Sequence, residues 1–210
     1  MHQHVQDYFD TLGALPLRSE VTDARGREIG LADCFAKLQP LLGGYRRAGK
    51  VMFVGNGGSA TIASHMAIDF SKNGNIPALC FNDGAALTCL GNDLGYDQVF
   101  AHQVASLGQL GDTLIAISSS GRSANIVNAV RAARSVGAYV VTLSGFDPDN
   151  PLRRLGDYNL YVPAGEYGFV EIVHLSLCHA LLDLAMGWSR EKGLWSAGEG
   201  NQAVAKAGVA

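Results

Sequence analysis

Two histidines and two carboxylates in this sequence are spaced like side chains that share one cleft. His65 and Asp69 are four residues apart in a segment with a helical pattern, so they project from one face about one turn apart. Glu171 and His179 are eight residues apart in a second helical segment, about 80° from alignment, and both can face one cleft. Two imidazole nitrogens and two carboxylates suit a borderline metal ion. A lone histidine on an apolar helix is usually a core residue, and we interpret His174 in this way.

Four serines cluster around a glycine in SSSGRSAN, directly after the apolar run TLIAI. An amphipathic helical pattern follows, and Ser123 is a natural N-cap for it. Hydroxyl groups and free backbone N–H groups at a helix N-terminus can donate to all three terminal oxygens of a phosphate monoester, without a lysine or a metal ion. The alternative is a serine-rich turn with a satisfied cap. We predict a phosphate site formed by Ser118, Ser119, Ser120 and Ser123.

The glycine loop GNGGSA follows the apolar run VMFVG and fits the dinucleotide pattern G-x-G-x-x-A. The full fingerprint also needs an acidic residue about 20 positions further on. Here the nearest candidate, Asp83, comes 28 residues after Gly55, which argues against a dinucleotide. A loop needed only for a tight turn is a third alternative. Otherwise the glycines let the backbone approach a ligand beside polar side chains at a helix N-terminus. The candidate binding residues are Asn56, Gly57, Gly58 and Ser59.

Five β-rich apolar runs alternate with helical patterns, which predicts the elements that position these residues. Continuous apolar runs are typical of strands covered on both faces, and their alternation with helices indicates parallel βαβ units. We therefore predict an α/β fold, a doubly wound three-layer sandwich with a five-stranded parallel sheet. The expected strands are residues 51–55, 77–81, 113–118, 139–145 and 158–163.

The segments at the two ends of the chain are expected to lie outside one domain over residues 31–190. Residues 1–30 are expected to be helical, with Val5, Phe9, Leu12 and Leu15 on one face, and a second helix is expected from about Leu31 to Ala48. The last helix should begin near Glu166 or Tyr167 and reach about Trp188. Residues 191–210 are rich in glycine and alanine with little periodicity, and we interpret them as a tail.

Charge and cysteine content narrow the partners and the compartment. The formal net charge is −3 with both signs mixed along the chain, so no polybasic surface for nucleic acid or an anionic membrane is expected. The four cysteines form no CxxC pair, which is typical of buried thiols in a reducing compartment. No signal peptide and no apolar run of about 18 residues is expected, so the predicted location is cytoplasmic.

GNGGS after the first strand, SSSGRS after the third and a histidine on the final helix resemble the sugar isomerase (SIS) domain. Within that family they resemble the phosphoheptose isomerases, which act on sedoheptulose 7-phosphate, and the resemblance covers about residues 30–188. It implies a flavodoxin-like fold, sugar phosphate binding by the serine loop, and sugar contacts from Asn56 and Ser59. Asn92 and Asp93 match the family's Asn-Asp position, whose aspartate contacts the substrate.

The resemblance also implies a zinc site and a reaction. It matches His65 and His179 to zinc ligands and gives His179 acid/base work, so the expected ligands are His65, Asp69, Glu171 and His179. Asp69 stands where the family commonly has glutamate, and Glu171 where it commonly has glutamine. The implied reaction is an enediol-type isomerisation of sedoheptulose 7-phosphate to D-glycero-D-manno-heptose 7-phosphate, for cell-surface polysaccharide such as lipopolysaccharide. It needs no nucleotide cofactor. The expected catalytic residues are His179 and Asp69, with Glu171 as ligand or substitute base.

A second class of function is a non-catalytic SIS protein that binds a sugar phosphate or a replication-initiator partner. Such relatives resemble this chain in the phosphate loop and lack the histidine of the final helix, so the presence of His179 favours an enzyme. The family further implies a homotetramer with active sites at subunit interfaces.

Overall fold

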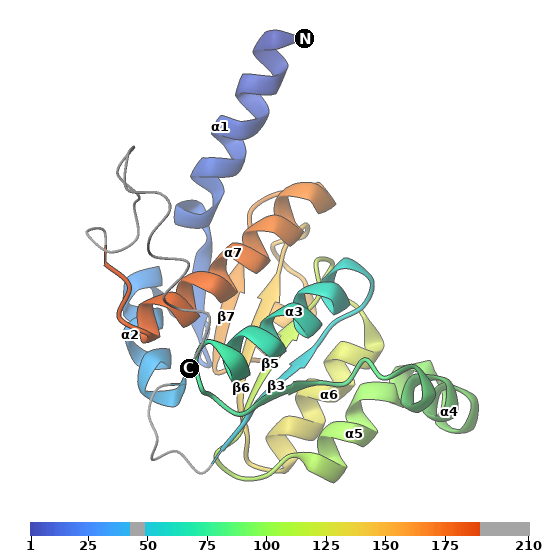
Figure 1. Cartoon of the computed structure of the whole chain (residues 1–210). Helices are drawn as coiled ribbons and strands as arrows, with labels where there is room; N and C mark the ends of the chain where they lie inside the picture. The colour runs from blue at the N-terminus through green and yellow to red at the C-terminus, as the bar shows by residue number, and fades with distance from the viewer. Residues whose placement is uncertain (43–48, 190–210) are drawn as a thin grey trace, which may run out of the picture.

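The computed structural model describes residues 1–42 and 49–189, which form a sheet covered by helices on both faces (Figure 1). Five strands are parallel, in the order β7-β6-β5-β3-β4. This is the doubly wound order of flavodoxin-like folds. The five predicted strands and their parallel pairing are confirmed. The strands are β3 (Val51–Val54), β4 (Ala78–Cys80), β5 (Thr113–Ile117), β6 (Tyr139–Ser144) and β7 (Tyr158–Tyr161).

Two further strands, which the sequence pattern did not predict, extend the sheet to seven. Helix α1 (His2–Arg18) ends before residue 30, and β1 (Glu20–Asp23) and β2 (Glu28–Ile29) follow it. Strand β1 pairs antiparallel with both β2 and β7. The prediction of a five-stranded sheet therefore missed an antiparallel hairpin. Strand β1 is mostly polar and β2 is very short, so neither shows an apolar run, and β1 is stabilised by pairing with β7 at the edge of the parallel sheet.

Helices form one layer on each face, and the strand side chains alternate between them. Val51 and Phe53 of β3 pack under α2 (Leu31–Leu42), α3 (Gly58–Lys72) and α7 (Tyr167–Ala185). Met52 and Val54 pack on the opposite face, under α5 (Val99–Leu107) and α6 (Ala124–Ser135). Helix α4 (Gly84–Leu94) lies at the margin of that second layer (Figure 1). Two short 3₁₀ helices, η1 (Tyr96–Gln98) and η2 (Pro151–Arg154), complete the connections.

The predicted helices at the two ends of the chain are found, with different bounds. Helix α1 points away from the body of the protein (Figure 1), and on its predicted apolar face Leu15 is buried whereas Val5 and Phe9 are exposed. Helix α2 is described as far as Leu42, and the rest of that predicted helix lies outside the described residues. The last helix begins at Tyr167 as expected and ends at Ala185. The predicted tail also lies outside the described residues.

Helix α7 is long and apolar enough to cross a membrane by length and composition alone, a feature that we did not expect from the sequence. Its residues Val170, Val173 and Leu177 are buried in the layer beneath, and α7 packs against α3. The length and apolar composition of α7 therefore fit its role as a core helix of this fold.

The cysteines are unpaired as predicted, but the predicted burial holds for two of them only, because Cys80 is half-buried and Cys89 is exposed. All four are free, and Cys34 and Cys178 are buried. Burial raises the pKa of both of these thiols to about 12, so they stay protonated and unreactive at neutral pH.

Candidate active site

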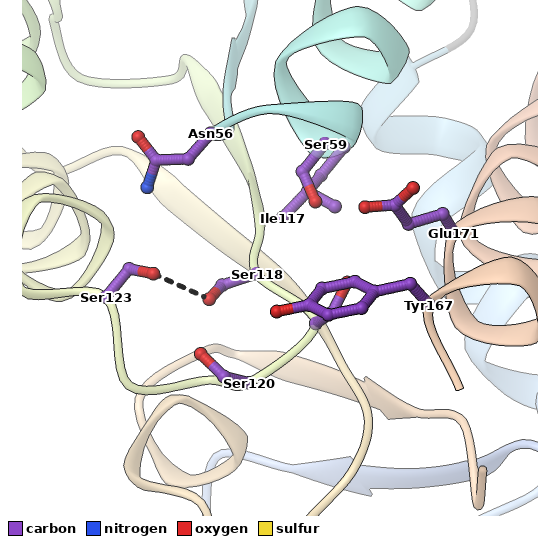
Figure 2. A pocket seen from close by; sticks show the side chains of 9 residues that line it. Asn56, Ser59, Ile117, Ser118, Ser120, Ser123, Tyr167 and Glu171 are labelled. Atoms are coloured by element: carbon purple, nitrogen blue, oxygen red, sulfur yellow. Dashed lines mark hydrogen bonds between the residues drawn. The ribbon is translucent and has the colours of Figure 1, made fainter. Parts of the chain in front are cut away.

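A cavity of about 100 Å³ opens where the chain changes from one face of the sheet to the other. Strands β3 and β5 are neighbours, but β3 leads into α3 on one face and β5 into α6 on the other. The loops therefore separate at the carboxyl ends of the two strands, which is where ligands bind in open α/β sheets. Figure 2 shows the side chains that line this cavity: Asn56, Ser59, Ile117, Ser118, Ser119, Ser120, Ser123, Tyr167 and Glu171.

The four predicted serines lie together in this cavity, and not all of their hydroxyl groups have a hydrogen-bond partner within the described residues. The Ser118 hydroxyl donates to Ser123 Oγ at 3.3 Å (Figure 2). Ser123 occupies the N-cap position of α6 as predicted, but its side chain makes no capping hydrogen bond. The Ser119 hydroxyl is buried and has no hydrogen-bond partner within the described residues. A buried unpaired hydroxyl costs about 1–3 kcal/mol, so these groups favour a bound acceptor over a self-sufficient turn.

Asn56, at the start of the first loop, is held by two residues that the sequence pattern did not single out. Its amide exchanges two hydrogen bonds with the buried amide of Asn125 on α6, both 2.9 Å long. The Tyr96 hydroxyl of η1 donates to Asn56 Oδ1 at 3.0 Å. Asn125 is a polar residue in the first turn of an amphipathic helix, two residues after Ser123. This position is the only feature of the sequence that pointed to a role for Asn125 in the site.

Glu171 lies against the glycines that begin α3. Gly57 has a φ of +54°, a backbone conformation that residues other than glycine rarely adopt. At Gly58 a Cβ atom would collide with the carboxylate of Glu171. The N-terminus of α3 therefore meets a negative charge, which its partial positive charge stabilises. Ser59, also predicted, is buried at the same place.

The histidines and one carboxylate form a second group on the adjacent helices α3 and α7. His65 Nε2 lies 3.2 Å from Asp69 Oδ2, and His179 Nδ1 lies 3.8 Å from the same oxygen. The two imidazole rings meet edge to face with centroids 5.2 Å apart. Three potential ligand atoms lie within 4.8 Å of one another. The structure does not place Glu171, the fourth predicted ligand, in this group, because its carboxylate lies at Gly58.

This group fits the donor requirements of zinc. Two imidazoles and one carboxylate are a ligand set of zinc sites that keep one position open. In a tetrahedral site with ligands about 2.1 Å from the ion, the ligand atoms lie about 3.4 Å apart. The distances from Asp69 Oδ2 to the two imidazole nitrogens, 3.2 and 3.8 Å, are close to this value. All three side chains are at least partly accessible, with His65 the most exposed. His65, Asp69 and His179 are therefore a candidate metal site.

Asn92 and Asp93 are not brought to this cavity. Both are exposed on α4, where Asn92 Nδ2 donates to Asp93 Oδ1 at 2.8 Å. Neither lines the cavity within one chain.

His174 is a core residue, as predicted. It is fully buried, and its Nε2 lies 3.1 Å from the carbonyl oxygen of Ser144. Burial lowers the pKa of His174 to about 4, partly offset by this hydrogen bond, so the imidazole is neutral at pH 7.

The sequence also matches known proteins. A family model described as SIS domain matches residues 40–145, which include both loops. The chain belongs to the SIS domain family, and more narrowly to its phosphoheptose isomerases, as the following relatives show. A phosphoheptose isomerase of Solidesulfovibrio magneticus is 37% identical over 172 residues, which are 79% of this chain and 78% of that protein.

Solved structures agree with this assignment. The structure is similar to that of a phosphoheptose isomerase from Neisseria gonorrhoeae, with a TM-score of 0.73, 32% identity, and coverage of 88% of this chain and 98% of that one. A phosphoheptose isomerase from Francisella tularensis has a TM-score of 0.72 and 29% identity, with coverage of 88% and 97%. The predicted family is confirmed.

Proposed function

We propose that this protein isomerises sedoheptulose 7-phosphate to D-glycero-D-manno-heptose 7-phosphate, a precursor of heptose in cell-surface polysaccharide. The observation that carries the proposal is the pairing of a hydroxyl-lined cavity with a group of two imidazoles and a carboxylate on neighbouring helices. Glu171 connects the two, because it lines the cavity and lies two helical turns before His179 on α7. One substrate can place its phosphate in the cavity and its reacting carbons toward the imidazoles.

The serine hydroxyls and backbone N–H groups at the start of α6 hold the phosphate. Asn56 and Ser59 contact sugar hydroxyls. Asp69 takes a proton from C1 of the ketose while His179 protonates the C2 carbonyl oxygen, which gives the enediol. The same pair then returns a proton to C2 and removes one from the C1 hydroxyl, which gives the aldose. Glu171 orients the sugar between the two groups.

We also propose zinc as the metal ion held by His65, Asp69 and His179. The mixed nitrogen and oxygen donor set and the phosphoheptose isomerase family support this choice. When bound, zinc polarises the carbonyl oxygen of the ketose. The protein side chains bind the substrate and move its protons.

A homotetramer and a cytoplasmic location complete the proposal. The exposed apolar residues of α1 support association between chains. Asn92 and Asp93, which lie apart from the cavity of their own chain, are then available to the site of a neighbouring subunit. The free thiols of all four cysteines fit a reducing compartment, which supports the cytoplasmic location.

The direct experiment is incubation of the purified protein with sedoheptulose 7-phosphate, followed by NMR for the aldose signal. Unphosphorylated sedoheptulose is the matched control, because it lacks only the group that the serine loop binds. We expect aldose from the phosphate alone, and a lower rate after treatment with a chelator that zinc restores. Binding of the sugar phosphate without any conversion would favour the non-catalytic alternative.

A further inference from the structure

Tyr167 is a cavity residue that neither loop motif includes. It is the first residue of α7, and it lines the cavity together with the serine loop although it is 63% exposed. In Figure 2 its ring extends from α7 toward Ser118 and Ser120. Its hydroxyl has no hydrogen-bond partner within the described residues. A tyrosine in this position presents a free donor and a flat apolar ring to whatever fills the cavity.

A neighbouring aromatic residue holds the Tyr167 ring in place. Phe146 meets it edge to face, with ring centroids 4.9 Å apart and an interplanar angle of 85°. Phe146 has a φ of +59°, in the left-handed region that residues other than glycine seldom adopt. Two hydrogen bonds fix this backbone, one from its N–H to the Ala164 oxygen and one from the Tyr161 hydroxyl to its carbonyl, each 3.0 Å. Strained residues that the surroundings hold this firmly cluster at ligand sites.

The cavity is small for a ligand site. Its volume of about 100 Å³ is below the roughly 300–1,000 Å³ of pockets that enclose a whole small molecule. It therefore takes only one end of a sugar phosphate, and the walls at its mouth contact the atoms next to the phosphate. Among the residues that the structure describes, Tyr167 is the one aromatic residue in that wall.

We propose that Tyr167 is a substrate-contacting residue that covers the mouth of the phosphate cavity, with its hydroxyl donating to a phosphate oxygen and its ring excluding water. Phe146 is the positioning residue that aims this ring. The inference rests on the proposed function, because it needs a phosphorylated substrate in the serine cavity. A hydrogen bond to a charged oxygen is among the stronger ones in proteins, and its loss corresponds to about a tenfold weaker binding.

The test measures binding apart from turnover. The probe is the polyol phosphate obtained by reducing sedoheptulose 7-phosphate, which lacks a carbonyl group and cannot isomerise. We expect Tyr167→Phe to raise its Kd about tenfold in calorimetry and Tyr167→Ala about thirtyfold. Both should raise KM for sedoheptulose 7-phosphate similarly, with kcat within about threefold. Tyr139→Phe, an exposed tyrosine at the start of β6, is the matched control and should change neither value.

A double-mutant cycle tests the positioning role of Phe146. Phe146→Leu should raise Kd about threefold in the presence of Tyr167 and leave it unchanged in the Tyr167→Ala background. Phe146→Tyr retains the aromatic ring and should restore binding to within about twofold of wild type. Equal effects of Phe146→Leu in both backgrounds would contradict a role through Tyr167.

The outcomes separate this inference from the proposed function. A wild-type protein that neither binds the polyol phosphate nor converts sedoheptulose 7-phosphate overturns both. A wild-type protein that does both, with Tyr167→Phe and Tyr167→Ala binding the probe within twofold of it, overturns the role of Tyr167 alone.

Discussion

Asp69 and Glu171 are the two carboxylates of the candidate site, and they occupy different surroundings. Asp69 lies within 4 Å of both imidazoles, whereas Glu171 lines the phosphate cavity and contacts the start of α3. The acid and the base must both reach the same two adjacent carbons of the substrate, so the short distance between Asp69 and His179 favours Asp69 as the base that works with His179.

We predict that Asp69→Asn lowers kcat by about 10² or more, because general base catalysis typically contributes about 10²–10⁴. Glu171→Gln keeps the shape of the side chain and removes its charge, so it should retain most of kcat and mainly change KM. Steady-state kinetics with zinc in excess measures both. The reverse order, with Glu171→Gln the more damaging change, would mean that Glu171 has become the base.

His174 makes folding stability depend on pH. Its pKa is about 4 in the folded protein and 6.5 in the unfolded chain, so between these values only the unfolded chain takes up the proton. Stability should therefore fall as the pH falls through this window, by about 3 kcal/mol in all and about 2 kcal/mol by pH 5.

The variant His174→Gln retains a donor for the Ser144 carbonyl and cannot titrate, so it isolates this contribution. Urea unfolding at pH 7 and at pH 5 should show that wild type loses about 2 kcal/mol more than the variant. Equal losses in the two proteins would show that this imidazole does not control the pH dependence.

The loop between β5 and α6 is the element that we propose for phosphate binding, and the serines that it places in the cavity are neutral donors, whereas its Arg122 pairs with Asp147. A neutral hydrogen bond contributes about 1 kcal/mol, and more to a charged acceptor. We predict that Ser119→Ala combined with Ser123→Ala raises KM at least tenfold, with a smaller effect on kcat. Ser135→Ala, at the far end of α6, is the control and should leave KM unchanged. Unchanged substrate binding in the double variant would mean that the loop has another role.

The parallel strands were predictable because most of them are continuous apolar runs, and the central ones are buried on both faces, as all residues of β3 and β5 are. The hairpin of β1 and β2 was not, because Val21 is the one apolar residue of β1, β2 is very short, and β1 depends on pairing with β7. A strand of this length is stabilised by its neighbours in the sheet, and those neighbours are distant in the sequence.

The candidate site, too, has parts that could be predicted from the sequence and parts that could not. The serine and glycine loops could be located from sequence because each links an apolar run to a helix N-terminus. The contacts from Asn125 and Tyr96 to Asn56 could not, since they join residues 69 and 40 positions apart in the chain. Spacing along α7 left Glu171 free to join the imidazoles, and only the packing of α7 on α3 places its carboxylate at Gly58 instead.

At the scale of the whole protein, helix α1 carries apolar side chains that the rest of its own chain leaves exposed. Val5, Tyr8 and Phe9 are exposed and line a hollow of about 420 Å³ on this helix. Exposed apolar surface of this kind is typical of a contact between protein chains. Light scattering should report about four times the mass of one chain, as the predicted tetramer requires.

The variant Phe9→Glu should shift this assembly to smaller species, because it places a charge in the contact. Leu110→Glu, which changes an equally apolar residue that is 81% exposed on another part of the protein, should not. A stable monomer with full activity would contradict the tetramer.

We propose that the candidate site moves a proton between adjacent carbons of a sugar phosphate. The most direct measurement is conversion of sedoheptulose 7-phosphate in deuterium oxide, with NMR of the aldose product at C2. The proposed enediol mechanism predicts deuterium at C2 of the aldose wherever the proton on Asp69 exchanges with the solvent before it is returned. It also predicts that His179→Gln forms the aldose at least about 10²-fold more slowly than wild type. Aldose formed by His179→Gln as fast as by wild type would contradict proton transfer through His179, and a protein with zinc added that forms no aldose would contradict the isomerase itself.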